Sequence, residues 1–310
     1  MRYAFGIDVG GTMVKTALVT ETGQVVHKTA VETEAARGFE VMVDRLHQVM
    51  RQSCQSQGIP ETSVEVVGVG LPAFLSRDRT RIVEAVNLGW RNVPLKEYLE
   101  RAFERPTVLE NDANVAALGE SWRGAGRGAA NVLCITVGTG IGGGIVLDGQ
   151  LLRGANGMAG EVGHLVIKED GPQCNCGHRG CVETLASATA IIRRAKELQS
   201  MGRITGEREI HGAVDVFQLA AMGESAATEV IQEAGSWLGY GIALAATITN
   251  PEKVVVGGGV SHAGDTFLAE VRRGFEEKAI HRVAEAATIV PAELGNDAGV
   301  IGAARLALQQ

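Results

Sequence analysis

The sequence predicts an α/β protein made of two similar domains, and three observations lead to that prediction. Strand patterns alternate with amphipathic helical patterns along the chain, which is the element order typical of α/β folds. A unit of strand, glycine turn and strand occurs twice, near residues 3–30 and near residues 132–153. The length of 310 residues allows roughly two domains of ordinary size. Two copies of one unit indicate two α/β domains around a cleft.

The first copy of the unit begins at the N-terminus. Alternating apolar residues predict strands over 3–9 and 14–19, joined by a tight turn at Gly10-Gly11, and a third strand over 24–30. Apolar residues then recur at helical spacing from Phe39 to Cys54. The remaining elements expected in this part of the chain are a strand over 64–69, a helix over 95–103, a strand over 107–110 and a helix over 112–122.

The second copy repeats this plan and leads into a helical half. A strand over 132–137 is expected to enter a glycine-rich turn over 138–144, and strands over 145–147 and 150–153 follow. Asp8 and Thr136 hold comparable places in the two copies. The elements expected after them are helices over 183–199, 226–248, 263–279 and 298–308, and a strand over 254–256.

Composition and charge exclude several classes of protein. The 36 acidic and 29 basic residues give a net charge of −7, so we expect no nucleic-acid partner. No run of eighteen apolar residues appears, and the N-terminus lacks the pattern of a signal peptide. We therefore expect a cytoplasmic protein without a membrane partner. Thiols stay reduced in that compartment, so the five cysteines do not indicate disulfides.

Two matched glycine turns predict a phosphate site. The first is Asp8-Val9-Gly10-Gly11-Thr12 and the second is Thr136-Val137-Gly138-Thr139-Gly140. Glycine lets a polyphosphate approach the backbone without meeting a Cβ atom, and successive N–H groups in such turns bind anions. The alternative is a pair of ordinary hairpins. A third glycine run, Gly257-Gly258-Gly259, makes that alternative weaker.

Side chains beside these turns suit the same chemistry. Thr12 and Thr139 offer hydroxyl donors, and Lys15 offers a cation. Asp8 follows a strand and is a candidate to hold Mg²⁺ through water. The spacing from Gly138 to Gly143 matches G-x-G-x-x-G, but a strand rather than a helix follows, which excludes a Rossmann dinucleotide site. The sequence also lacks the P-loop motif.

Taken together, these motifs resemble those of the ROK family of repressors and sugar kinases, within the actin-like ATPase superfamily. Among its members the sequence is most similar to bacterial ATP-dependent glucokinases. The resemblance runs from Ile7-Asp8-Val9-Gly10-Gly11-Thr12 to Leu294-Gly295-Asn296-Asp297-Ala298-Gly299. It implies an actin-like (ribonuclease H-like) fold with a small domain of residues 1–115 plus about 296–310 and a larger domain of residues 116–295. It also implies that the first two turns hold the phosphates of ATP and that Gly257-Gly258-Gly259 lies against the adenosine.

The segment Glu110-Asn111-Asp112 has two interpretations. The residues alone favour an N-cap at Asn111 or Asp112, which is common where a strand passes into a helix. The resemblance implies instead that Asp112 is the general base for the sugar hydroxyl that attacks the γ-phosphate, and that Asn111 holds the sugar. A carboxylate that orients the attacking hydroxyl suits phosphoryl transfer, where general-base assistance contributes about 10²–10⁴-fold.

The resemblance also implies a set of sugar ligands. Carboxylates and imidazole accept hydrogen bonds from a polyol, and Glu161, His164 and Glu183 are expected to converge on it. Asn87, in Asn87-Leu88-Gly89-Trp90, is a further candidate that favours glucose. From the residues alone, the two glutamates are solvated surface acids and Asn87 is a turn residue. The family usually has Pro-Gly where this chain has Pro72-Ala73; alanine resists positive φ, so we expect a different loop path.

Three cysteines predict a metal site. Cys174, Cys176 and Cys181 have C-x-C-x₄-C spacing, and the glycines among them allow a tight loop. A fourth ligand would complete a closed tetrahedral Zn²⁺ site, which is structural rather than catalytic. His178 inside the loop is one candidate for that ligand. The resemblance implies His164, whose second ring nitrogen would then face the sugar.

The expected function is therefore ATP-dependent phosphorylation of a hexose, with the 6-hydroxyl of glucose as the favoured acceptor and glycolysis as the setting. Kinases for N-acetylglucosamine, N-acetylmannosamine, mannose or fructose are the alternatives within the class, and polyphosphate is an alternative donor. A sugar-responsive regulator without turnover is the alternative from another class. Repressors of the family carry an additional N-terminal DNA-binding segment, whereas the first phosphate strand here begins at Tyr3. The resemblance also implies a dimer or tetramer.

Overall fold

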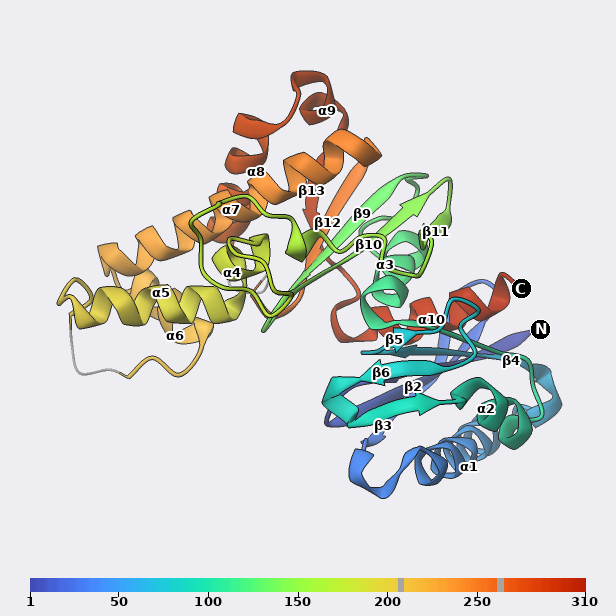
Figure 1. The fold of residues 1–310 in the computed structure, drawn as a ribbon. Helices are drawn as coiled ribbons and strands as arrows, with labels where there is room; N and C mark the ends of the chain where they lie inside the picture. Colours follow the sequence, from blue (N-terminus) through green and yellow to red (C-terminus); the bar gives the residue numbers. More distant parts are fainter. Residues whose placement is uncertain (206–208, 261–264) are drawn as a thin grey trace. The chain divides into compact units, whose positions relative to one another are not determined.

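The structure is a computed structural model that describes residues 1–205, 209–260 and 265–310. It contains two compact units, and Figure 1 labels their helices and strands. The first unit comprises residues 1–128, 144–159 and 293–310, and the second comprises residues 129–143 and 160–292. The domain boundaries expected near residues 115 and 296, and the cleft between the domains, stay predictions.

The sheet of the first unit has five strands in the order β3-β2-β1-β4-β8. Strand β2 is antiparallel to β1 and β3, whereas β4 is parallel to β1 and β8 is parallel to β4. The strand patterns predicted from the sequence are confirmed here to within two residues at each end. Their bounds are β1 Tyr3–Val9, β2 Met13–Thr20, β3 Val25–Glu32, β4 Val64–Leu71 and β8 Thr107–Asn111.

Alternation along β1 separates the two faces of this sheet. Phe5 and Ile7 belong to a core shared with helices α1 and α2, whereas Ala4 belongs to a smaller core shared with α10. Helix α10 can lie close to the sheet because a Cβ atom at Gly68 would lie 1.8 Å from the carbonyl oxygen of Ala303. The helices are α1 Phe39–Gln57, α2 Leu95–Phe103, α3 Asp112–Arg123 and α10 Ala298–Leu308.

A small sheet of three short strands was not predicted. Strand β6 is antiparallel to both β5 and β7, and the tight turn between β6 and β7 carries Asn87. Strands of two to four residues are too short to show a clear period in the sequence. Nearby, Ala73 is buried and does not adopt a positive φ, so the backbone at this position does not require glycine. The bounds are β5 Phe74–Leu75, β6 Ile82–Ala85 and β7 Trp90–Val93.

The second large sheet has the order β11-β10-β9-β12-β13, which repeats the first sheet position for position. Strand β12 is parallel to β9 and β13, and β11 is antiparallel to β10. The predicted duplication is therefore confirmed. The turn predicted over 138–144 is too long, because β10 already begins at Ile141. The bounds are β9 Val132–Val137, β10 Ile141–Leu147, β11 Gln150–Leu152, β12 Lys253–Gly257 and β13 Thr288–Pro291.

Most of the second unit's remaining residues are helical. The single helix predicted over 183–199 is wrong, because Ser187 interrupts it and caps the following helix by accepting a 3.2 Å hydrogen bond from the N–H of Ala190. The predicted start of a helix at residue 263 lies outside the described residues. The helices are α4 Val182–Ala186, α5 Ala188–Ser200, α6 Ala213–Ala221, α7 Ser225–Thr249, α8 Asp265–Lys278 and α9 His281–Ala286.

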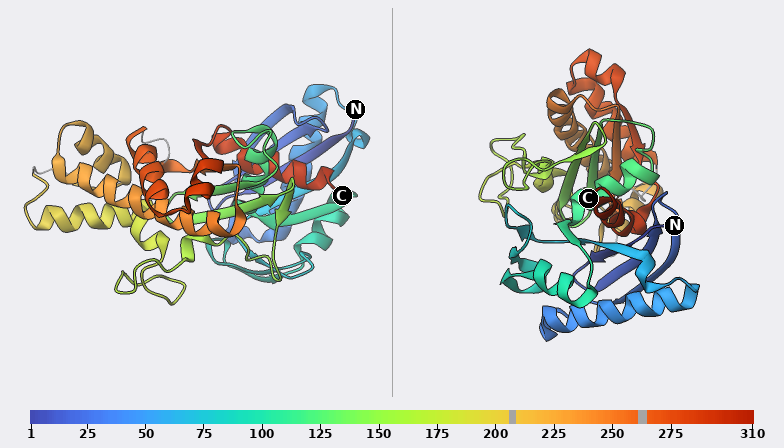
Figure 2. Two further views of the ribbon diagram at one scale, coloured as in Figure 1. Left: turned by 90° about the horizontal axis from the view of Figure 1, so that it is seen from above. Right: turned by 90° about the vertical axis from the view of Figure 1, so that its right-hand side faces the viewer.

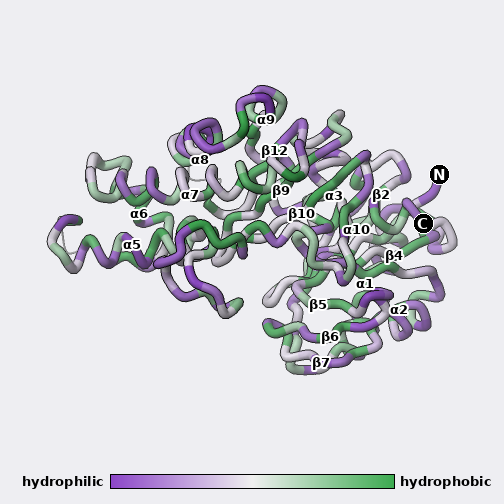
Figure 3. The backbone as a smooth tube through the Cα atoms, turned by 45° about the horizontal axis from the view of Figure 1, so that its top comes forward, coloured by the Kyte–Doolittle hydropathy of each residue, from purple (hydrophilic) through white to green (hydrophobic). Residues whose placement is uncertain are grey.

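Helix α7 is the central helix of this unit. It packs against α5, α6 and α8, and the left view of Figure 2 shows α5 and α7 running side by side. Figure 3 shows hydrophobic residues concentrated in strands such as β4 and β9. Among the described residues, no helix is both long enough and apolar enough to span a membrane.

Candidate active site and metal centre

The first glycine turn is fixed at its base and open at its tip. The N–H of Gly10 donates to the carbonyl of Met13 at 2.9 Å. Thr33, which directly follows β3, makes two further hydrogen bonds to the turn. The Thr33 hydroxyl donates to the carbonyl of Gly10 at 2.6 Å, and its N–H donates to that of Thr12 at 2.8 Å. No atom lies within 4 Å of where a Cβ atom of Gly11 would be. The turn therefore presents backbone to an approaching anion.

Asp8 stands at the end of β1, directly opposite Lys15 on β2. Its carboxyl group lies against the start of α10, where a Cβ atom at Gly299 would come within 2.5 Å of it. Lys15 Nζ donates to the backbone carbonyl and side-chain oxygen of Asn296, each at 3.3 Å. Burial raises the pKa of Asp8 to about 6, an effect opposed by Lys15 and reinforced by Asp112. A half-buried carboxylate beside an open glycine turn is a suitable partner for a cation.

The N-cap interpretation of the strand–helix junction is confirmed for Asn111. Its side-chain oxygen accepts the N–H groups of Ala113 at 2.9 Å and Asn114 at 3.4 Å. The side-chain NH₂ group of Asn111 takes no part in this cap. Asp112 is the first residue of α3, and burial raises the pKa of its carboxyl group against the opposing hydrogen bond from Ala113. The charge of Asp112 acts on Asp8, so the first unit brings these two carboxyl groups together.

Glu110, which was not among the residues predicted to act in the site, supports this junction. Its side chain is only 3% exposed and accepts a 2.6 Å hydrogen bond from Nε of Arg153. The other carboxylate oxygen accepts the N–H of Asn111 at 3.1 Å and the side-chain NH₂ of Asn114 at 3.2 Å. The pair holds the backbone just before Asp112. Arg153 lies 43 residues further along the chain, and no sequence pattern links it to Glu110.

The second glycine turn is held by the segment that begins at α4. Oε2 of Glu183 accepts the N–H of Ile141 at 2.9 Å, just after the turn. The carbonyl of Gly138 accepts the N–H of Ala188 at 2.9 Å, and the carbonyl of Thr139 accepts the hydroxyl of Thr189 at 2.8 Å. The N–H of Gly138 is used within the turn, where it donates to the carbonyl of Gly140 at 2.9 Å, and a Cβ atom at Gly138 would have no neighbour within 4 Å.

The third glycine run lies beside this second turn. Gly257 pairs with Thr136 between β12 and β9. Gly258 has a φ of 91°, and a Cβ atom there would lie 2.4 Å from the carbonyl oxygen of Val137. Glycine is therefore required at this position by both conformation and space. Gly259 is exposed, and no atom lies within 4 Å of its Cβ position. The second unit thus brings these two glycine segments together.

The expected sugar residues divide between the two units. Asn87, Asn111 and Asp112 belong to the first unit, and Asn87 is exposed. Glu161, His164 and Glu183 belong to the second. Oε2 of Glu161 lies 3.9 Å from Nε2 of His164, across the short helical turn Val162–His164. Glu183 is half-buried, and its carboxylate is turned toward the second glycine turn.

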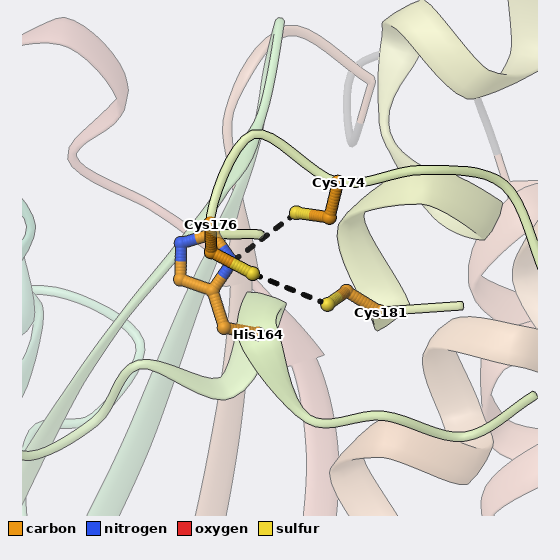
Figure 4. Close-up of side chains that lie close together, drawn as sticks. All are labelled: His164, Cys174, Cys176 and Cys181. Carbon is orange, nitrogen blue, oxygen red and sulfur yellow. Dashed lines mark hydrogen bonds between the residues drawn. The ribbon is translucent and has the colours of Figure 1, made fainter. Parts of the chain in front are cut away.

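His164, Cys174, Cys176 and Cys181 converge on one point, as Figure 4 shows. Their ligand atoms all lie within 4.8 Å of one another. Nδ1 of His164 is 3.6 Å from Sγ of Cys174, and Sγ of Cys176 is 3.6 Å from Sγ of Cys181. His178 contacts one member of this cluster, with its Nδ1 3.6 Å from Sγ of Cys176. The sequence-predicted ligands are therefore brought together, with His164 in the position of the fourth ligand.

The donor set fits a tetrahedral zinc ion. Bonds of about 2.3 Å to sulfur place neighbouring ligand atoms about 3.7 Å apart, close to the separations observed. Burial raises the pKa of Cys174 and brings that of Cys181 to about 12, whereas hydrogen bonds from His178 lower the pKa of Cys176 to about 6. Three thiolates at this point therefore require a cation to offset their burial and mutual repulsion.

Comparison with known proteins agrees with this architecture. The model of the ROK family matches residues 4–310. A glucokinase of Halalkalibacterium halodurans is 44% identical over 100% of this chain and 96% of its own length. A ROK hexokinase of Thermus thermophilus superposes with a TM-score of 0.86 at 32% identity, covering 99% of this chain and 98% of that one.

A second solved structure is similar over its whole length. It is a ROK family glucokinase of Streptomyces griseus in complex with glucose and AMPPNP, with a TM-score of 0.78 and 34% identity. The alignment covers 99% of this chain and 100% of that one. The predicted actin-like ATPase fold is thereby confirmed. With a family model matched almost from end to end and a relative 44% identical over the full chain, this protein belongs to the ROK family.

Proposed function

We propose that this protein is an ATP-dependent hexose kinase, a glucokinase that phosphorylates the 6-hydroxyl of glucose. The observation that carries the proposal is that two half-buried carboxyl groups, Asp8 and Asp112, lie near enough to interact beside an open glycine turn. Phosphoryl transfer needs a carboxylate for the attacking hydroxyl and another for the metal that accompanies the phosphates. The relatives named above, glucokinases and a hexokinase, support the same activity.

Asp112 serves as the general base in this proposal. It stands at the first position of α3, where its ionised form accepts the proton of the sugar hydroxyl as that oxygen attacks the γ-phosphorus. Asn111 donates from its side-chain NH₂ to the sugar, since its oxygen is already used as the helix cap. Glu161, His164, Glu183 and Asn87 are the other proposed sugar ligands.

The glycine turns serve as the nucleotide site. Gly10, Gly11 and Thr12 receive phosphate oxygens in the first unit, with Lys15 nearby as a cation. Asp8 would hold Mg²⁺ through water, and the ion neutralises charge on the phosphates when it is bound. In the second unit, Thr136 and the turn Gly138-Thr139-Gly140 receive phosphate, and the run Gly257-Gly258-Gly259 lies against the adenosine.

Zinc is proposed as a structural ion held by His164, Cys174, Cys176 and Cys181. Four protein ligands close the coordination shell, so the ion would not contact substrate directly. Its role is to fix the ring of His164, whose Nε2 then faces outward near Glu161. A cytoplasmic location and a homodimer or homotetramer also stay predictions.

The mutation Asp112→Asn tests the catalytic assignment. It keeps the size of the side chain but removes the base, so we expect kcat to fall at least 100-fold while glucose affinity stays within a few-fold. ADP release with Mg-ATP and glucose measures the first quantity, and calorimetric titration of glucose measures the second. Asp44→Asn, on the exposed face of α1, is the matched control and should retain full turnover. Turnover by Asp112→Asn close to that of the control would exclude Asp112 as the base.

A further inference from the structure

We propose that residues 181–189 transmit the state of the Cys/His cluster to the second glycine turn, so that nucleotide binding depends on the bound metal. Within this segment Glu183, Ala188 and Thr189 act as positioning residues for the turn Gly138-Thr139-Gly140. The proposal rests on the proposed function, in which that turn receives nucleotide phosphate. It goes beyond that function because the metal site was assigned there only to the sugar side.

Three hydrogen bonds of 2.8–2.9 Å join this segment to the turn, and they come from three successive places along it. Glu183 holds the N–H of Ile141, the first residue of β10. The N–H of Ala188 and the hydroxyl of Thr189 hold the carbonyls of the turn itself. Each carbonyl held on this side orients its peptide unit, and the N–H groups that would bind phosphate belong to the same peptides.

Close packing makes the contact with Glu183 sensitive to small movements. A Cβ atom at Gly140 would lie 2.4 Å from Oε2 of Glu183, so the carboxylate occupies the space that any other residue's side chain would need. A carboxylate set this closely against the backbone cannot shift inward. If it shifts outward, the N–H of Ile141 loses its charged acceptor, which weakens the support of the turn.

The same segment is anchored in the Cys/His cluster. Cys181 is fully buried and is the N-cap residue of α4, two positions before Glu183. Its carbonyl accepts both the N–H of Thr184 at 2.9 Å and the hydroxyl of Thr184 at 2.8 Å. The other oxygen of Glu183 lies 3.9 Å from Sγ of Cys174. Glu183 therefore contacts a cluster residue on one side and the backbone after the turn on the other.

Helix α4 cannot hold this arrangement alone. It has five residues, and helices of that length have no stability without tertiary support. Its residues Val182 and Ala186 are buried and the helix packs against α7, while the end that carries Glu183 is fixed further by Cys181 and by the hydrogen bond from the N–H of Val182 to the carbonyl of Leu165. A metal ion held by His164, Cys174, Cys176 and Cys181 would join Cys181 to residues outside α4, and loss of the ion would remove that link. Removal of the metal would thus loosen the start of α4 and, through Glu183, its contact with the backbone after the turn.

Nucleotide affinity measured without sugar tests this inference. We would titrate Mg-ADP by calorimetry into the zinc-loaded protein and into protein freed of zinc by a chelator, with the chelator removed before Mg²⁺ is added. We expect the dissociation constant for Mg-ADP to be at least tenfold higher in the metal-free protein. Adding zinc back should return it to the value of the zinc-loaded protein. Hydrogen exchange should show faster exchange at residues 138–141 in the metal-free form, whereas the strands β1 and β4 of the first unit should be unchanged.

Substitutions at two threonines, Thr189 and Thr247, distinguish this coupling from a general loss of structure. Thr189→Val removes the hydroxyl that holds Thr139 and should weaken Mg-ADP binding about two- to tenfold in zinc-loaded protein, with the KM for glucose unchanged. Thr189→Ser keeps the hydroxyl and should restore the affinity. Thr247→Val is the matched control, because its exposed hydroxyl makes a hydrogen bond of equal length, 2.8 Å, inside α7.

The possible outcomes distinguish the inference from the proposed function. If zinc-loaded wild-type protein fails to bind Mg-ADP, the proposed nucleotide site itself is wrong. If it binds Mg-ADP equally well with and without zinc, the coupling is wrong while the proposed function stands. Equal affinities for Thr189→Val and Thr247→Val would likewise contradict the positioning role of residue 189.

Discussion

At the scale of single residues, the site combines roles that the sequence presents as alternatives. Asn111 was expected either to cap a helix or to hold a sugar, and its side chain has one group for each task. The oxygen caps α3, and the NH₂ group, which also interacts with the carboxylate of Asp112, is the part proposed to contact the sugar. Asp112 follows directly, so the cap also fixes where the carboxylate points. A structural interpretation of such a residue therefore does not exclude a functional one.

The raised carboxyl pKa values predict the pH dependence of activity. Asp8 titrates at about pH 6 rather than near 4, and burial also raises the pKa of Asp112. Both groups are proposed to act in the ionised form, so kcat/KM for Mg-ATP should fall as the pH drops below about 6. Initial rates between pH 4.5 and 8 measure this, with coupling enzymes in excess. A rate unchanged down to pH 5 would contradict ionisation of Asp8 as a requirement.

The raised pKa of Asp8 acts on stability in the opposite direction, because its contribution to the free energy of unfolding falls as the pH rises. A carboxyl group whose pKa is higher in the folded protein binds protons more tightly there, so its contribution to stability falls as pH rises from about 4 through 6. Asp8→Asn removes this cost and should raise the free energy of unfolding by about 1–3 kcal/mol at pH 7 while abolishing turnover. Urea unfolding at pH 7 checks it, and lower stability of the variant would show that burial is not the dominant effect.

Loss of the ion pair between Glu110 and Arg153 should lower both stability and catalytic rate. Glu110→Ala leaves the half-buried Arg153 without its partner and the N–H of Asn111 without its acceptor. We expect the free energy of unfolding to fall by about 2–4 kcal/mol. We also expect kcat to fall, because Asp112 is only two residues from Glu110. Glu84→Ala, which breaks the exposed pair with Arg91, should cost less than about 1 kcal/mol. Equal losses in the two variants would remove any special role from Glu110.

At the scale of elements, long periodic segments were predictable and short or interrupted ones were not. The strands of the first sheet and helices α2 and α10 match the expectation closely, because burial of one face imposes a regular pattern. The three-stranded sheet of residues 74–93 was missed because its strands are too short to show one. The helix expected over 183–199 is divided at Ser187, whose hydroxyl competes for the backbone as a cap.

Helix α3 carries a buried carboxylate that joins two distant segments of the first unit. Glu120 is 1% exposed and accepts the N–H groups of Ala125 at 2.9 Å, Glu293 at 3.2 Å and Leu294 at 2.8 Å. Glu120→Ala should lower the free energy of unfolding by about 3–5 kcal/mol, because buried N–H groups lose a charged acceptor. The exposed Glu97 on α2 offers the control, and Glu97→Ala should change stability by less than about 0.5 kcal/mol. Similar urea midpoints for both variants would contradict this role.

At the scale of the whole molecule, the duplicated sheet order was predictable and the supporting contacts were not. Two copies of one strand and turn pattern indicated two sheets of the same plan, which β1-β2-β3 and β9-β10-β11 confirm. The motifs also marked the glycine turns and the cysteines. Contacts such as Glu110 with Arg153, or Glu183 with Ile141, join residues more than 40 positions apart. Only folding brings those partners together, so a single sequence carries no signal for them.

Transfer of phosphate from ATP to glucose, the proposed reaction of this chain, can be measured directly with a panel of sugars. ADP release would be followed with Mg-ATP and, in parallel, glucose, mannose, fructose, N-acetylglucosamine and N-acetylmannosamine. We expect the highest kcat/KM for glucose, with glucose 6-phosphate as the product. A strong preference for another of these sugars would contradict the glucose assignment, and absence of ADP release with all five would contradict the kinase itself.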